Sequence, residues 1–196
     1  MKNQARKTTT NSTQKDTEVS WLEKFFIDQL KDIYYVEQQL LKALSEFDQA
    51  STSDDLGEAF ATHRAQTERH IKRLEKVFEL VGQKPQAKKC EAMDGLLKEA
   101  RNIIKETKEG TATRDAALII GAQKIEHYEI ATYGSLLQLA ITMDFHRAAS
   151  ILDKTLQEEE MADHSLTFLA ESFINVRAEK EKPYSWQRSV EMDFVL

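Results

Sequence analysis

Acidic residues interrupt an otherwise apolar helical pattern twice in the second half of the chain. Glu126 and Glu129 are three residues apart, and Glu159 and Asp163 are four apart. Both spacings put a pair on one face of a helix. Glu129 and Glu159 each lie about 15 residues from the turn predicted near Asp144, so they face each other when the helices run antiparallel. Carboxylates gathered in this way are ligands for hard divalent cations.

The first half of the chain brings polar residues to the same kind of position. Glu37 lies about 14 residues before the turn predicted at 51–52, and Gln66 lies about 14 residues after it, so the two meet at one height. His63 lies just below that height on the same face. An imidazole beside carboxylates is a further ligand for such cations.

These groups converge in a mostly apolar interior, where their charge must be neutralised. The convergence comprises five carboxylates and one imidazole: Glu37, His63, Glu126, Glu129, Glu159 and Asp163. Two like charges about 4 Å apart repel by about 4 kcal/mol at an effective dielectric constant of about 20. Several such pairs rival the whole stability of a domain, about 5–15 kcal/mol. Protons could relieve the repulsion, whereas two divalent ions would cancel most of it. Hard oxygen ligands with an imidazole suit iron or manganese better than a soft-ligand metal. Zinc is possible, but the number of ligands argues against a closed structural zinc site.

Each of these residues also has a structural interpretation when it is considered alone. Glu37 would face solvent if the helical phase were shifted by one position, and a single buried histidine such as His63 is more often a hydrogen-bonded core residue than a ligand. His70 lies about one turn beyond the height of Gln66, and we interpret it as a supporting or structural residue. Glu158 is expected on a solvated face. The coincidence on all four helices favours the metal site, because buried carboxylates are rare unless paired or metal-bound.

Four long amphipathic segments are predicted to position these groups. Their apolar residues recur at alternating spacings of three and four, the pattern of a bundle helix. The predicted helices cover about residues 20–49, 54–81, 113–143 and 145–176. Ser20, followed three residues later by Glu23, forms a capping-box signature at the first helix. The crossover at 83–112 contains a shorter amphipathic helix, so we predict an all-α, ferritin-like antiparallel four-helix bundle with one long crossover carrying an extra helix.

The two ends of the chain lack this pattern. Residues 1–19 are predicted to be a disordered polar tail, residues 20–176 the bundle and residues 177–196 a C-terminal arm. The arm could reach a partner subunit, although such tails more often pack on their own domain. Basic residues in the polar tail could bind DNA, but isolated charges are usually just solvated, so nucleic acid is not an expected partner.

Composition disfavours several classes of protein. Gly (6) and Pro (2) are scarce and 31% of the residues are charged, which favours helices over sheets. The formal net charge of -6 disfavours binding to nucleic acid and anionic membranes. Cys90 is the only cysteine, so no intrachain disulfide is possible, which fits a cytoplasmic location. No apolar run approaches the roughly 20 residues that span a bilayer, and the N-terminus has no apolar signal core, so no membrane partner is expected.

Four stretches of the chain resemble the YciE/YciF family of ferritin-like stress proteins. They are LKDIYYVEQQLLKAL (30–44), RLEKVFELVGQKPQAKKCEAMDGLLKEA (73–100), DAALIIGAQKIEHYEIATYGSLLQLA (115–140) and LDKTLQEEEMADHSL (152–166). The resemblance covers about residues 20–170, and the strings KCEAM and QKIEHYEIATYG are specific to it. It implies a homodimeric four-helix bundle with a di-metal centre of the ferroxidase type.

The resemblance also implies a set of ligands. Carried over by position, the metal ligands are Glu37, His63, Gln66, Glu126, Glu129, Glu159 and Asp163. Gln66 stands where relatives are expected to have glutamate, and a neutral amide is a weaker ligand than a carboxylate. The Glu-x-x-His pairs usual in ferritin-like proteins are absent from the second and fourth helices, which have His63-x-x-Gln66 and Glu159-x-x-x-Asp163 instead.

The expected function is the binding of two iron ions and the oxidation of ferrous ion by O2 or peroxide under stress. Two other interpretations stay open. One is a non-catalytic stress or scaffold bundle without functional metal. The other is a manganese catalase-like or oxygenase-like enzyme on the same frame, because a fold does not determine a reaction.

Overall fold

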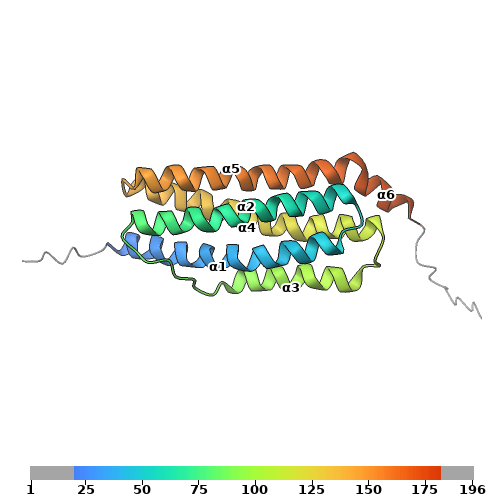
Figure 1. The fold of residues 1–196 in the computed structure, drawn as a ribbon, viewed down its shortest axis with the longest axis horizontal. Coiled ribbons are helices and arrows are strands. Elements are labelled where there is room, and N and C mark those ends of the chain that lie inside the picture. Colours follow the sequence, from blue (N-terminus) through green and yellow to red (C-terminus); the bar gives the residue numbers. More distant parts are fainter. Residues whose placement is uncertain (1–19, 182–196) are drawn as a thin grey trace, which may run out of the picture.

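The chain folds into an antiparallel bundle of four long helices (Figure 1). In this computed structural model, which describes residues 20–181, the bundle helices are α1 (Trp21–Ala50), α2 (Asp54–Leu80), α4 (Ala112–Thr142) and α5 (His146–Leu169). A further helix, α3 (Glu91–Glu106), lies in the crossover between α2 and α4. The described residues contain no β-strand. The predicted fold class is therefore confirmed, and the observed bounds of α1, α2 and α4 lie within one residue of the prediction.

Local signals in the sequence set the helix ends. The Ser20 hydroxyl accepts a hydrogen bond from the backbone N–H of Glu23 at 3.1 Å, as the capping-box signature predicts. Gly82 adopts φ 69° just beyond α2, a left-handed conformation that glycine reaches without steric cost. Asp144 adopts φ 61° between α4 and α5, where a short polar side chain is tolerated. The tight turn at Asp144 brings residues of α4 and α5 at equal distances from it to the same height, whereas Gly82 leads into the crossover.

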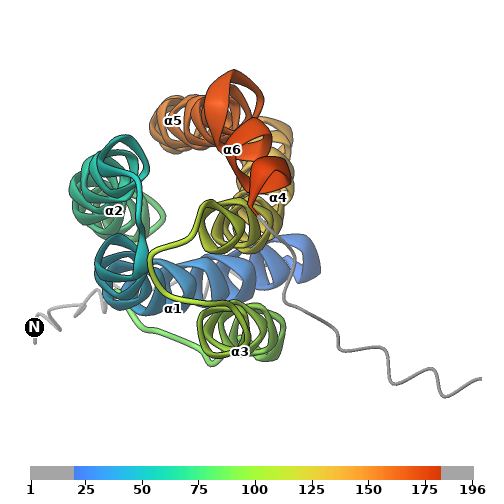
Figure 2. The ribbon, with the colours of Figure 1, turned by 90° about the vertical axis from the view of Figure 1, so that its right-hand side faces the viewer.

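Around the bundle axis the helices follow the order α1, α2, α5, α4 (Figure 2). Helix α3 lies outside this ring, against α1 and α4. Gly121 on α4 allows the close approach, because a Cβ there would lie 3.3 Å from Ile103 Cδ1 and 3.5 Å from the Ala100 Cβ. The α1/α4 side of the ring is thus partly covered, whereas no further helix of residues 20–181 covers the α2/α5 side.

The centre of the bundle is apolar along most of its length. Its largest fully buried side chains include Phe26, Phe47, Phe60, Phe78 and Tyr133. Burial of one large apolar side chain contributes about 1.5–3 kcal/mol, so this core stabilises the bundle. Polar residues interrupt it in the middle third of the helices, where Glu37, His70, Glu129 and Glu159 are 0% exposed.

The last bundle helix ends differently from the prediction. After Leu169 the chain forms one turn of π-helix, η1 (Ala170–Ile174), and then a short helix, α6 (Asn175–Lys180). Helical structure therefore continues to Lys180 rather than ending at 176. Glu181 accepts hydrogen bonds from the backbone N–H groups of Ala112 at 2.7 Å and Thr113 at 3.0 Å. A carboxylate satisfies the unpaired N–H groups at the start of α4, and this contact holds α6 against the bundle.

The predicted polar tail at 1–19 and residues 182–196 of the predicted arm lie outside the described residues. Residues 177–181 of that arm belong to α6 and its C-terminal cap. No helix within 20–181 combines the length and apolar character that a membrane crossing requires.

Candidate metal centre

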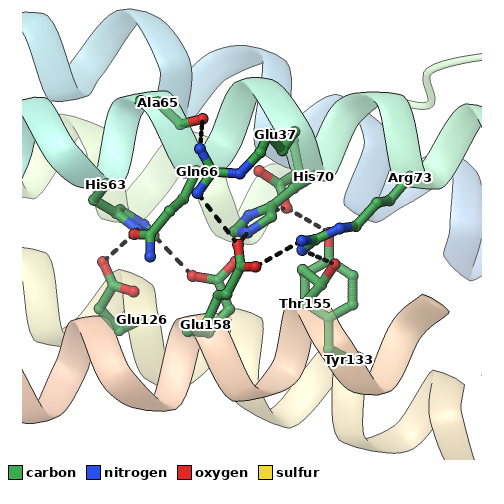
Figure 3. A network of polar contacts seen from close by, with 12 residues as sticks. Glu37, His63, Ala65, Gln66, His70, Arg73, Glu126, Tyr133, Thr155 and Glu158 are labelled. Atoms are coloured by element: carbon green, nitrogen blue, oxygen red, sulfur yellow. Dashed lines mark hydrogen bonds and ion pairs between the residues drawn. The ribbon is translucent and has the colours of Figure 1, made fainter. Parts of the chain in front are cut away.

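Two groups of carboxylates and imidazoles meet inside the bundle (Figure 3). The first, here termed the His63 group, consists of His63, Glu126, Glu129 and Glu159. The second, the His70 group, consists of Glu37, His70 and Glu159. In each group, one nitrogen or oxygen atom per residue lies within 4.8 Å of all the others. Small side-chain rotations therefore suffice to bring these atoms around a common cation.

Helix geometry explains why these residues meet. Glu126 and Glu129 are three residues apart on α4, and His63 and His70 are seven apart on α2, so each pair shares one helix face. Glu159 of α5 contacts both imidazoles: its Oε2 lies 3.5 Å from His63 Nε2 and its Oε1 lies 2.9 Å from His70 Nδ1. A single carboxylate thus offers one oxygen to each group.

His63 is oriented by a neutral partner. Its Nε2 lies 3.4 Å from Glu126 Oε1, and its Nδ1 lies 3.2 Å from Gln66 Oε1. Because an amide oxygen only accepts hydrogen bonds, Nδ1 carries the proton and the lone pair of Nε2 faces the carboxylates. Histidine ligands of metals are usually held by an outer acceptor in this way.

His70 is oriented in the same manner, but by a charged partner. Its Nε2 lies 2.9 Å from Glu158 Oε2, and its Nδ1 lies 3.4 Å from Glu37 Oε1. Arg73 donates a 2.6 Å hydrogen bond to Glu158 Oε1, and the Tyr133 hydroxyl donates to Glu37. Figure 3 shows Arg73 and Tyr133 beside His70, away from His63. Glu158 is 23% exposed, so a chain of charged side chains connects the His70 group to the surface.

Several buried oxygen atoms of the centre have no hydrogen-bond partner among residues 20–181. They are both carboxylate oxygens of Glu129 and one oxygen each of Glu37, Glu126 and Glu159, whose other oxygen contacts His70. An unpaired buried polar atom costs about 1–3 kcal/mol, and an ionised one costs more. A cation bound between these oxygens supplies the missing partner, so the residues present fit a metal. Carboxylate oxygens with imidazole nitrogens suit iron, manganese or zinc rather than a soft metal.

Burial changes the protonation of these groups. It raises the pKa of Glu126 and Glu129 well above the usual value, and the nearby charge of Glu159 raises both further. Burial also raises the pKa of Glu37. Burial alone would lower the pKa of His70, but the carboxylates of Glu159 and Glu37 outweigh it and raise that pKa to about 10. His70 therefore keeps its second proton at neutral pH in the metal-free centre, and a bound cation would displace it.

The structure brings together five of the seven side chains expected as ligands: Glu37, His63, Glu126, Glu129 and Glu159. Gln66 lies beside them, and its oxygen contacts the His63 ring. Asp163 lies outside both groups. Its Oδ1 is 3.1 Å from Gln123 Nε2 and 3.3 Å from His127 Nε2. These two residues of α4 hold the Asp163 carboxylate one turn further along α5 than Glu159.

Sequence reasoning misses His70 as a candidate ligand and Glu158 as its partner. Counting residues from the predicted turn places His70 about one turn beyond Glu37 along the bundle axis. The two long side chains nevertheless span that distance. The seven-residue spacing between His63 and His70 is a usable signal, because positions i and i+7 share a helix face. Glu158 has no such signal: it flanks Glu159 in the sequence and reaches His70 only through its side-chain conformation.

Comparison with known proteins assigns the chain to a family. The family profile described as "Domain of unknown function (DUF892)" matches residues 21–179. The chain belongs to this family. Protein YciF of Escherichia coli strain K12 is 42% identical over 161 residues, which are 82% of this chain and 96% of YciF. The resemblance to the YciF family is therefore confirmed.

Solved structures share the YciF-like bundle. The crystal structure of the E. coli stress protein YciF matches with a TM-score of 0.75 at 42% identity, covering 79% of this chain and 97% of that one. YcfI from Rhodopseudomonas palustris is 37% identical, with a TM-score of 0.73 over 78% of this chain and 96% of its own. A Xanthomonas campestris protein, 18% identical, has a TM-score of 0.64 over 82% and 97% of the two chains, and this likeness shows the fold alone.

Proposed function

We propose that this YciF-like chain binds two divalent cations, iron in the first place, and oxidises ferrous ion as protection under stress. The observation that carries the proposal is the pair of overlapping groups, each with one imidazole, that share Glu159. The proposed ligands are Glu37, His63, His70, Glu126, Glu129 and Glu159. Two divalent cations carry four positive charges, which offset the four carboxylates of this set. Gln66 supports the set by orienting His63.

Iron enters the proposed reaction as substrate. Two ferrous ions give up one electron each, and hydrogen peroxide takes up this pair with two protons to form two waters. With O2 as oxidant, the same pair and two protons give hydrogen peroxide. Loading displaces the Nδ1 proton of His70, and the raised pKa values of Glu126 and Glu129 make loading more favourable as pH rises. Glu158 holds Nε2 of His70 throughout, so the ring keeps its orientation.

Anaerobic titration with ferrous ion, followed by addition of O2 or peroxide, tests this proposal. We expect two ions per chain and rapid formation of ferric product, measured by its absorbance. Glu129→Gln removes one charge from the His63 group and should lower the stoichiometry to one and slow oxidation. Glu160→Gln, at an exposed neighbouring position, should change neither. Absence of ferrous binding by the wild-type chain would overturn the proposal.

A non-catalytic stress or scaffold bundle is the second candidate, and one observation favours it. The raised pKa values of Glu37, Glu126 and Glu129 allow protons to neutralise the centre without any metal. The titration would then show no binding at neutral pH. Manganese is the alternative cation for the same ligands, and disproportionation of peroxide by manganese-loaded protein would indicate a catalase-like reaction.

The homodimer and the cytoplasmic location stay predictions, from the resemblance and the cysteine content respectively. Light scattering on the purified full-length chain tests the first, and cell fractionation tests the second.

A further inference from the structure

A groove of about 480 Å³ lies between α2 and α5 and reaches one half of the metal centre. This α2/α5 groove is lined at its inner end by His63, Gln66 and Glu126. Neither Glu37 nor His70 lines it. The groove therefore gives access to the His63 group and not directly to the His70 group.

The α2 side of the groove carries a polar stripe, with Ala59 and Phe60 beside it. The stripe consists of Asp55, Glu58, Thr62, His63 and Gln66. Their spacings of three, four, one and three residues place them along one side of the helix. Asp55 and Glu58 are exposed, and a rise of 1.5 Å per residue puts Asp55 about 12 Å from His63 along the helix axis. Oxygen atoms of Glu58 and Thr62 occupy the interval, so a cation meets a polar group at each turn.

The α5 side of the groove is mainly apolar. Its apolar residues include Met161 and Phe168, which are 64% and 63% exposed, and Ala162 and Leu166. His164 and Ser165 are its exposed polar residues. A low-dielectric wall opposite acidic side chains focuses their field into the groove. The arrangement attracts cations and repels anions.

Buried ligand atoms lie where the polar stripe ends. His63 Nε2 and Glu126 Oε2 have no hydrogen-bond partner within the described part of the chain, and their side chains are 5% and 2% exposed. We infer that divalent cations enter and leave the centre through the α2/α5 groove, past Asp55 and Glu58, and that the His63 group exchanges its cation before the His70 group. This inference rests on the proposed metal binding and adds its route and order.

Cobalt(II) is a suitable probe, because its visible absorbance reports loading in a stopped-flow experiment and release into excess EDTA. We expect the wild-type chain to release two ions in two phases, the faster from the His63 group. Ala162→Phe fills the groove and should slow loading and the fast release phase at least about tenfold. The double variant Asp55→Asn, Glu58→Gln should slow loading about threefold or more at low ionic strength, and less at high salt. Neither change should alter the final stoichiometry.

Two matched variants control for bulk and for charge. Ala131→Phe fills a second groove between α1 and α4, beside Phe25 and Leu139, on the opposite side of the helix ring. Glu68→Gln removes a charge from an exposed position of α2 outside the α2/α5 groove. Both should load within about twofold of the wild-type rate.

The route is overturned if both the groove-filling variant Ala162→Phe and the rim-charge variant (Asp55→Asn, Glu58→Gln) bind two ions at the wild-type rate. The order is overturned if release from the wild-type chain is a single phase. Should circular dichroism show that Ala162→Phe does not fold, the rim-charge variant decides the route alone. Absence of cobalt binding by the wild-type chain at equilibrium would instead overturn the proposed function, and with it the route, before any rate is measured.

Discussion

The His63 and His70 groups offer similar ligands but differ in what surrounds them. His63 is held by the neutral amide of Gln66 and lines a groove open to solvent. His70 is held by Glu158, which Arg73 in turn holds. A carboxylate raises the basicity of a histidine ligand more than an amide does, because it attracts the ring proton more strongly. The outer contact, rather than the imidazole itself, therefore distinguishes the two cation positions.

The two groups also differ in their number of carboxylates, and they have one carboxylate in common. Glu159 belongs to both, Glu126 and Glu129 belong only to the His63 group, and Glu37 belongs only to the His70 group. Loss of a shared residue should thus affect both positions, whereas loss of an unshared one should affect a single position. This distinction allows the two halves to be tested separately.

The largest expected effect follows from removing the shared carboxylate. Glu159→Gln should weaken the binding of both cations by at least about a hundredfold, which is about 2.7 kcal/mol. Isothermal titration with ferrous ion or cobalt(II) under nitrogen measures the change, with Glu160→Gln as the control at an exposed neighbouring position. Retention of two tight positions in Glu159→Gln would show that the groups do not share this ligand.

Removal of one imidazole should abolish one position and keep the other. His63→Ala should lose the rapidly exchanging cobalt(II) ion, and His70→Ala should lose the slowly exchanging one, because each imidazole belongs to a single group. Equilibrium titration should give one ion per chain for each variant. If both alanine variants release their remaining ion at the same rate, the two positions do not differ in access.

Substitution of Glu158, the outer partner of His70, should weaken cation binding less than loss of the imidazole does. Glu158→Gln keeps the shape of the side chain but removes its charge, and we expect about 10–100-fold weaker binding at the His70 group. The ion at the His63 group should bind as in the wild-type chain. Titration resolves the two positions. Equal weakening of both would contradict a role confined to His70.

The corresponding substitution beside His63 should strengthen cation binding at the His63 group. Gln66→Glu gives His63 a charged acceptor, and we expect up to about tenfold tighter binding at the His63 group. Competition between the protein and a chelator of known affinity measures the gain. Unchanged affinity would show that the outer partner of His63 does not influence its cation.

The smallest effect concerns the stability of the metal-free chain as pH changes. The pKa of His70 is 6.5 in the absence of partners and about 10 in the fold, so its proton stabilises the fold fully below pH 6.5 and less as pH rises toward 10. The pKa values of Glu126 and Glu129 are also raised, so their protons likewise stabilise the fold less as pH rises above 4.5. The thermal midpoint in EDTA should therefore fall by about 3 °C or more between pH 6 and pH 9.

Calorimetry or circular dichroism measures this change of the midpoint with pH, and His70→Gln supplies the control, because an uncharged amide removes the contribution of the His70 proton. A midpoint that is constant or rises over this range would contradict the protonated centre. Metal-loaded protein should lack the fall, because the cations have displaced the protons.

Regular helix geometry explains how much of this centre could be predicted. Glu126 and Glu129 share a face because three residues make nearly one turn, and Glu37 and Glu159 reach their height because antiparallel helices rise equally from their turns. The capping box at Ser20 is equally local. Such features depend on spacing along one helix or on the distance from one turn, so they can be read without knowing any side-chain conformation.

Side-chain orientation explains what could not be predicted. Asp163 has the spacing of a ligand, yet Gln123 and His127 hold it outside both groups. Glu158, expected on a solvated face, reaches inward to His70. The π-helical turn at Ala170–Ile174 and the continuation of helix to Lys180 were likewise not indicated by the periodicity.

The sequence by itself determined the four helices, their antiparallel order and the height at which acidic residues interrupt the apolar core, because period and turn distance are properties of the chain. Only the tertiary structure decided which nitrogen of His63 and of His70 faces Glu159, that Glu159 offers one oxygen to each group, and that the α2/α5 groove borders the His63 group. These outcomes depend on side-chain torsions and on neighbours from other helices, and no spacing along a single helix specifies them.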